Sequence, residues 1–216
     1  MGVAVFAAMS NGETVAPGEF GKKALRALRK AQRAVARKKK GSANRRKAVR
    51  RVQTLHARVA NARKDFLHKI STIIAKNHGT VVVEALQVRN MSASAKGSVE
   101  EPGRNVRQKA GLNRSILDQG WRMFRTLLGY KLADRGGKLV EVPAAYTSQT
   151  CSVCGSVDHA SRVSQAHFIC TACGHTENAD INAAKNILRR ADCPSMPVEG
   201  YRIGRPVEAG STRRAA

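Results

Sequence analysis

Four cysteines of the chain fall into two CxxC pairs. Cys151 and Cys154 form the first pair, and Cys170 and Cys173 form the second, fifteen residues further along. Each pair can point two sulfurs at one ion from a tight turn, and two such turns complete the four-thiolate shell of a structural zinc site. The spacing therefore predicts a zinc ribbon that holds one structural zinc and leaves no open position for water.

Three other interpretations of these cysteines are open, of which a thioredoxin-like redox pair would need two such sites to use four matched cysteines. Disulfides would use the same residues, but Cys193 makes the cysteine count odd, and the chain begins without a recognisable secretory signal. His159, His167 and His175 lie close enough in sequence to compete as ligands. Since four thiolates already close a tetrahedral shell, we expect the histidines to remain outside it and Cys193 to be a free thiol.

Two carboxylates stand where chemistry is plausible. Glu84 directly follows the apolar run 81–83, which suits a strand covered on both faces, and Asp180 stands at the start of a helical pattern. If both meet at one edge of a sheet, they predict a magnesium site for phosphodiester cleavage. The alternatives are that Glu84 is a solvated strand end and that Asp180 only caps its helix.

The charge of the chain indicates a polyanionic partner. Its 216 residues include 39 Lys and Arg against 15 Asp and Glu, a formal net charge of +24. This excess excludes an ordinary neutral enzyme and favours nucleic acid, because cations that neutralise phosphates release condensed counterions. A basic surface without specific binding is the alternative. No apolar run is long enough to span a membrane, so we expect a soluble, cytoplasmic protein.

Most of this charge lies between Gly21 and Ile70, which contain 19 Lys and Arg and one acid, Asp65. Apolar residues recur there every three or four positions, which predicts a helical hairpin of about 21–40 and 44–77 with a basic outer surface. A solvated hairpin without a ligand would show the same pattern. The candidate nucleic-acid-binding residues flank the predicted turn: Arg37, Lys38, Lys39, Lys40, Arg45, Arg46, Lys47, Arg50 and Arg51.

The remaining patterns predict strands and helices around these motifs. Asn11 and Gly12 mark a hairpin turn between two antiparallel strands. The further expected elements are strands 80–86 and 139–142, helices 112–134 and 180–190, and a disordered tail over 191–216. This order favours an α/β fold with a mixed sheet, into which the basic helical hairpin and the cysteine module 146–176 are inserted.

Several segments together carry a resemblance to a known family. The matching segments are 84–91, 109–113, 146–155, 170–174 and 180–187. In order and spacing they resemble the OrfB/TnpB proteins of insertion sequences, compact relatives of the type V CRISPR nucleases. The resemblance covers about residues 1–190.

The resemblance implies an RNase H-like (RuvC-type) nuclease domain interrupted by a zinc ribbon. Residues 1–145 would form its first part, 146–176 the ribbon and 177–190 its last helix. Glu84 matches the second catalytic carboxylate of the family and Asp180 the third, so both would hold magnesium. The implied partners are DNA and a transposon-derived guide RNA, which would place the protein at the nucleoid of a bacterium or archaeon.

The start of the chain departs from the family pattern. The segment 2–5 is similar to the residues just after the first catalytic Asp of the family. That Asp would fall one residue before Met1, and Glu13 and Glu19 lie too far along to replace it. We therefore expect an incomplete catalytic site. Three hypotheses remain: a nuclease domain from a transposable element, a cleavage-inactive nucleic-acid-binding remnant, and a zinc-ribbon protein of translation or transcription.

Overall fold

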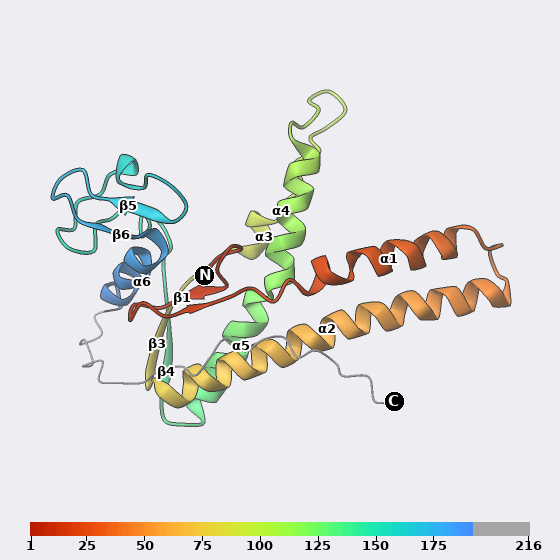
Figure 1. Cartoon of the computed structure of the whole chain (residues 1–216), viewed down its shortest axis with the longest axis horizontal. Coiled ribbons are helices and arrows are strands. Elements are labelled where there is room, and N and C mark those ends of the chain that lie inside the picture. The colour runs from red at the N-terminus through yellow and green to blue at the C-terminus, as the bar shows by residue number, and fades with distance from the viewer. Residues whose placement is uncertain (192–216) are drawn as a thin grey trace. The chain divides into compact units, whose positions relative to one another are not determined.

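The computed structural model describes residues 1–191 (Figure 1). These residues divide into two compact units. Among the described residues, the first unit comprises Met1–Pro17, Ile74–Gln87 and residues 128–191. The second comprises Gly18–Ile73 and Val88–Leu127. Cys193 and the predicted tail lie outside the described residues, apart from Ala191.

The second unit contains the predicted basic hairpin. Its helices are α1 (Phe20–Ala36) and α2 (Ala43–Asn77), whose last turn belongs to the first unit. Gly41 takes a left-handed conformation at φ 83° in the turn, and the Ser42 hydroxyl accepts a hydrogen bond from the Arg45 amide. The Phe20 and Phe66 rings pack at a centroid distance of 5.5 Å and join the two helices.

The helix predicted over 112–134 is two helices, and that prediction was wrong. They are α4 (Val106–Gln119) and α5 (Trp121–Ala133), separated by Gly120 at φ 70°. A Cβ at Gly120 would lie 3.1 Å from side-chain atoms of both Arg63 and Leu67, so α2 approaches the break closely. The apolar period runs through this break, so it could not be seen from periodicity alone. A short helix, α3 (Val88–Met91), was not predicted.

Within residues 1–191, the strands of the first unit form three separate two-stranded sheets in place of the expected mixed sheet. The antiparallel pair β1 (Ala7–Ala8) and β2 (Thr14–Val15) encloses the predicted turn, in which Gly12 has φ 92°. Residues 3–6 form a bend, in which the Gly2 amide donates a hydrogen bond to the Phe6 carbonyl. The first strand is therefore limited to Ala7 and Ala8 and does not extend a larger sheet.

The other two sheets carry the candidate site elements. Strands β3 (Thr80–Glu84) and β4 (Lys138–Val142) pair in parallel, with Glu84 opposite Val142. Strands β5 (His167–Ile169) and β6 (Thr176–Asn178) pair antiparallel within the cysteine module, which also contains the 3-10 turn η1 (His159–Ser161).

The last helix, α6 (Ala179–Arg189), closes the first unit and packs against β3, β1, β5 and β6. Asn178 begins this helix, since its side-chain oxygen accepts hydrogen bonds from the amides of Asp180 and Ile181. Ala179 is fully buried together with Cys151, Phe168 and Cys170, so the start of α6 shares a core with the cysteine module. None of the helices in residues 1–191 is both long and apolar enough to cross a membrane.

Candidate metal centre and nucleic-acid surface

The four cysteines lie on two turns of the same design. In the first, the Gly155 amide donates to the Cys151 carbonyl at 3.0 Å, and in the second, the Gly174 amide donates to the Cys170 carbonyl at 3.0 Å. Both glycines have a left-handed backbone, at φ 77° and 71°. In each turn, the left-handed glycine lets the backbone reverse directly after the second cysteine of the CxxC pair. Both sulfurs of the pair then lie on the inside of the turn.

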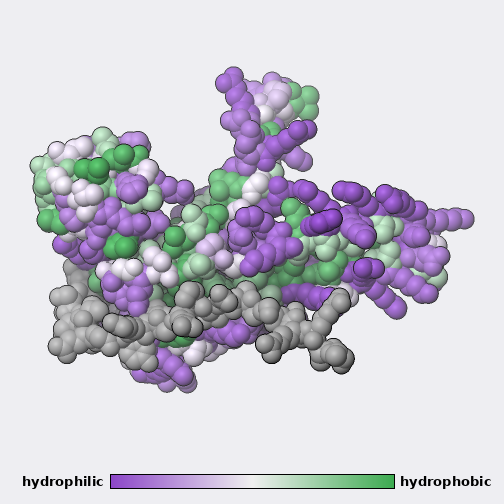
Figure 2. All heavy atoms as spheres, viewed as in Figure 1, coloured by the Kyte–Doolittle hydropathy of each residue, from purple (hydrophilic) through white to green (hydrophobic). Residues whose placement is uncertain are grey.

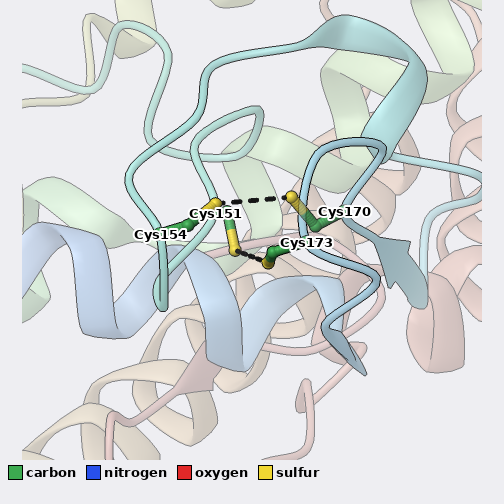
Figure 3. Close-up of side chains that lie close together, drawn as sticks. All are labelled: Cys151, Cys154, Cys170 and Cys173. Atoms are coloured by element: carbon green, nitrogen blue, oxygen red, sulfur yellow. Dashed lines mark hydrogen bonds between the residues drawn. The ribbon is translucent and has the colours of Figure 1, made fainter.

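The sulfurs converge on one point (Figure 3). All four Sγ atoms lie within 4.8 Å of one another. The Cys151 and Cys173 sulfurs are 3.8 Å apart, and those of Cys154 and Cys170 are 3.6 Å apart. A tetrahedral ion bound to sulfur at about 2.3 Å holds its ligands about 3.8 Å apart, whereas a disulfide brings sulfurs to about 2.0 Å. The arrangement therefore fits a four-thiolate metal centre and not two disulfides.

The electrostatics of the cluster also favour a cation. The backbone amides of Cys173 and Ala172 are the main reason that the pKa of Cys170 falls to about 6, so this thiol ionises readily. The His175 amide also favours the Cys173 thiolate, but hydrogen bonds with the other thiols and burial outweigh it and raise the pKa of Cys173 to about 12. Four thiols this close cannot all ionise to thiolates without a positive charge among them. A divalent metal ion would supply that charge.

The three nearby histidines are outside the cluster, as expected. Within residues 1–191, the only group of three or more His, Cys, Asp and Glu placed to share an ion is the set of four cysteines. The Nε2 atom of His175 lies 3.4 Å from a carboxylate oxygen of Glu177. Burial raises the pKa of the Glu177 carboxyl, but hydrogen bonds from Lys185 and His175 outweigh it and lower the net pKa. This network fastens β6 to α6.

Glu84 occupies the end of β3, as predicted. Its side chain is 14% exposed and forms an ion pair with the amino group of Met1. The contact joins residues 83 positions apart, and sequence patterns gave no sign of it. It places the first backbone nitrogen of the chain at the carboxylate of Glu84.

Asp180 lies in the first turn of α6, as predicted, with 37% of its side chain exposed. An Arg162 guanidinium nitrogen lies 3.6 Å from its carboxylate. Helix α6 packs against β3, whose last residue is Glu84. The two carboxylates thus stand on packed elements of one unit, but in the described residues they are not part of a group of three or more potential metal ligands.

The predicted nucleic-acid-binding cations gather at the turn of the α1/α2 hairpin. Eight of the nine are exposed, and hydrophilic residues dominate this part of the surface (Figure 2). Arg45, the ninth, is half-buried and donates to the Val35 carbonyl at 3.2 Å, while Arg46 donates to the Gly41 carbonyl at 3.0 Å. None of the nine pairs with a carboxylate of residues 1–191.

A shallow depression of about 300 Å³ lies beside this turn. Its lining comprises Gly41, Ser42, Arg45, Arg46, Val49 and Arg50. The unpaired cations and the open surface suit a polyanion that is contacted along its backbone. Arg45 and Arg46 also stabilise the turn itself, a structural role that charge counting did not reveal.

The segment 109–113 has a structural role that its sequence did not disclose. The Lys109 ammonium donates to the Met91 carbonyl at 2.6 Å. The Asn113 amide donates to the carbonyls of Ser92 and Ala93 at 2.9 and 3.1 Å. These bonds satisfy carbonyls at the end of α3, so the two polar residues of α4 hold the end of α3 in place.

Comparisons with known proteins agree with this arrangement. The OrfB_IS605 family model, described as "Probable transposase", matches residues 1–95. A second model, described as "Cas12f1-like, TNB domain", matches residues 121–187, which include all four cysteines and Asp180.

Curated relatives align with nearly the whole chain. InsQ of Escherichia coli, whose name describes an RNA-guided DNA endonuclease, is 47% identical over 211 residues, or 98% of this chain and 52% of InsQ. A protein of Streptomyces pristinaespiralis with the same functional description is 36% identical over 216 residues, covering 100% of this chain and 49% of that protein. The chain spans about half the length of these relatives.

A solved structure shares the fold. The cryo-EM structure of a Cas12f1–sgRNA–target DNA complex matches with a TM-score of 0.50 at 21% sequence identity. The match covers 81% of this chain and 43% of the Cas12f1 chain.

Proposed function

The chain belongs to the OrfB/TnpB family of insertion-sequence proteins, and on that premise we propose that it forms the RuvC-like and zinc-ribbon part of an RNA-guided DNA endonuclease. The observation that supports this most directly is the placement of Glu84 and Asp180. Glu84 is the last residue of β3, and Asp180 lies in the first turn of α6. The two elements pack against each other in the same compact unit. The family relationship argues against a zinc-ribbon protein of translation or transcription.

Zinc is the ion proposed for the four cysteines. Zinc suits four thiolates, and a closed shell of protein ligands makes the site structural. Cys151, Cys154, Cys170 and Cys173 would hold it, and through the core shared with Ala179 they would stabilise the start of α6.

Magnesium is the ion proposed for the carboxylates. Glu84 and Asp180 would supply anionic oxygen ligands, the type that magnesium prefers. Bound magnesium would stabilise the attacking and leaving oxygens of a phosphodiester. Arg162 neutralises Asp180 in the present arrangement and lies near enough to contact a phosphate brought to that carboxylate.

The contact between Met1 and Glu84 supports a position beside Glu84 for the first catalytic Asp of the family. In a chain that continues before Met1, this nitrogen would be a neutral amide, which can still donate to the Glu84 carboxylate and would then hold the preceding residue beside it. An Asp at that position of a longer chain would bring a further oxygen ligand to Glu84. Because the chain spans about half the length of its relatives, the proposed activity is that of the family protein as a whole.

DNA and a guide RNA are the proposed partners, and the α1/α2 hairpin is the proposed contact surface. Aromatic residues make up only 4% of the chain, so base stacking contributes little and binding is directed at the phosphate backbone. Base pairing with the guide would then provide the sequence specificity. Such a protein works in the cytoplasm, at the nucleoid.

A magnesium-dependent cleavage assay tests the proposal. We expect no cleavage by the chain from Met1 and cleavage by a chain extended upstream through the family Asp and combined with its guide RNA. Glu84→Ala or Asp180→Ala in the extended chain should each abolish cleavage, while Glu100→Ala, which removes an exposed carboxylate from a loop, should not. An extended chain that binds guide and target but never cleaves would instead support a cleavage-inactive nucleic-acid-binding protein.

A further inference from the structure

Two buried asparagines join the first cysteine turn to α6. Asn182 is fully buried and Asn186 is 5% exposed. They stand four residues apart, so both side chains project from the same face of the helix. A buried amide costs free energy unless its donors and acceptor are satisfied, so the partners of these side chains are informative.

In the part of the chain that the structure describes, the hydrogen bonds of the two side chains all go to the backbone of residues 147–152. The Ser152 amide donates to Asn182 Oδ1 at 2.8 Å, and Asn182 Nδ2 donates to the Thr150 carbonyl at 2.8 Å. Asn186 Nδ2 donates to the carbonyls of Thr147 and Thr150, at 3.0 and 2.7 Å.

These partners immediately surround a metal ligand. Thr150 and Ser152 are the neighbours of Cys151, so Asn182 holds the backbone on both sides of that cysteine. Asp180 lies two residues before Asn182, in the first turn of the same helix. The path from the Cys151 thiol to the Asp180 carboxylate therefore runs through one buried side chain and one helical turn.

We propose that Asn182 and Asn186 are positioning residues that couple metal binding by the cysteines to the placement of Asp180. With the metal bound, the first turn is rigid, the four hydrogen bonds form, and α6 presents Asp180 beside β3. Without the metal, the turn loses its order, the two amides lose their partners, and the start of α6 loosens. The structural zinc would thereby control the nuclease centre. This inference rests on the proposed function of Asp180.

Hydrogen exchange measured by mass spectrometry tests the coupling in the full chain loaded with zinc. We expect amides of residues 179–189 to exchange slowly in the zinc-loaded protein and at least tenfold faster after removal of zinc by a chelator. Asn182→Ala should give the fast exchange with one zinc still bound. The matched control is Arg189→Ala, which changes an exposed residue of the same helix and should leave exchange slow. Slow exchange in zinc-loaded Asn182→Ala would overturn the proposal.

Asn186→Ala provides a second variant in case Asn182→Ala does not fold. It removes two of the four hydrogen bonds and leaves the two that Asn182 forms on either side of Cys151, so we expect a smaller acceleration of exchange. Far-UV circular dichroism verifies that each variant is folded. An Asn186→Ala protein with unchanged exchange would contradict the role given to this residue.

Manganese binding followed by electron paramagnetic resonance separates positioning from simple stability. Asp180→Ala should weaken manganese binding by the zinc-loaded protein. Asn182→Ala should also weaken this Asp180-dependent binding several-fold, although the Asp180 carboxylate itself is unchanged. If Asp180→Ala has no effect on manganese affinity, the proposed metal site fails, and hydrogen exchange still decides whether the zinc turn and α6 are coupled.

Discussion

A Cβ atom on Gly137 would lie 2.4 Å from the carbonyl oxygen of Gly79, at the point where β3 and β4 begin to pair. The two backbones approach this closely because the Lys138 amide donates to the same carbonyl at 2.9 Å. The parallel pair that ends at Glu84 therefore depends on a glycine before β4.

Gly137→Ala should destabilise the protein by about 1–3 kcal/mol, because the carbonyl is part of the backbone and the strands must separate to admit a methyl group. Gly79→Ala is the matched control. A Cβ there meets nothing within 4 Å, so its free energy of unfolding should stay within about 0.5 kcal/mol of the wild type. Urea unfolding of both variants provides the comparison, and equal stabilities would contradict the close approach.

Metal analysis should find one zinc per chain, because four sulfurs form one cluster. Cys170→Ser should lower the zinc content and the order of the ribbon, since an incomplete shell binds the ion too weakly to offset the entropy of ordering the turns. Cys193→Ser, which changes a cysteine outside the two CxxC pairs, should retain the metal. Disulfides without zinc in protein purified under reducing conditions would contradict this assignment.

The parts of the molecule governed by local spacing could be predicted from sequence. A CxxC turn places its two sulfurs by itself, and the periodicity and charge of 20–77 define the two basic helices without reference to the rest of the chain. The position of Glu84 at a strand end and of Asp180 at a helix start also followed from local patterns.

Long-range contacts could not be predicted in the same way. The contact of Met1 with Glu84 spans 83 residues, and the bond of Asn182 to the Thr150 carbonyl spans 32. Asn182 and Asn186 would pass for polar positions of an exposed helix face until their backbone partners are known. Gly120 breaks a continuous apolar period through its left-handed backbone, which no pattern of hydrophobicity records.

The hairpin cations should dominate binding to nucleic acid. Replacing Arg45, Arg46, Arg50 and Arg51 with Ala should reduce the dependence of log K on log salt by a few units, since each phosphate neutralised on duplex DNA contributes about 0.9 to that slope. The matched control removes four exposed arginines that lie outside the hairpin: Arg104, Arg107, Arg114 and Arg122. Because both variants lose the same charge, a larger effect of the control would show that the hairpin faces away from the ligand.

The buried face of α2 makes an ion pair whose loss should be costly. Asp118 of α4 accepts hydrogen bonds from Arg63 at 2.6 Å and from the Gly21 amide at 2.8 Å, and its side chain is 11% exposed. Asp118→Ala leaves the guanidinium and the amide without this partner, so we expect a loss of about 3 kcal/mol in the free energy of unfolding.

Asp65→Ala is the control for this variant, because it removes an ion pair from the exposed face of the same helix. Asp65 and Lys69 lie 2.7 Å apart, but their side chains are 61% and 56% exposed. Water and salt screen such a pair, so its loss should cost no more than about 0.5 kcal/mol. Denaturant unfolding at low and high salt measures both variants. Equal losses would mean that the Asp118 pair contributes no more to the free energy of unfolding than a surface pair does.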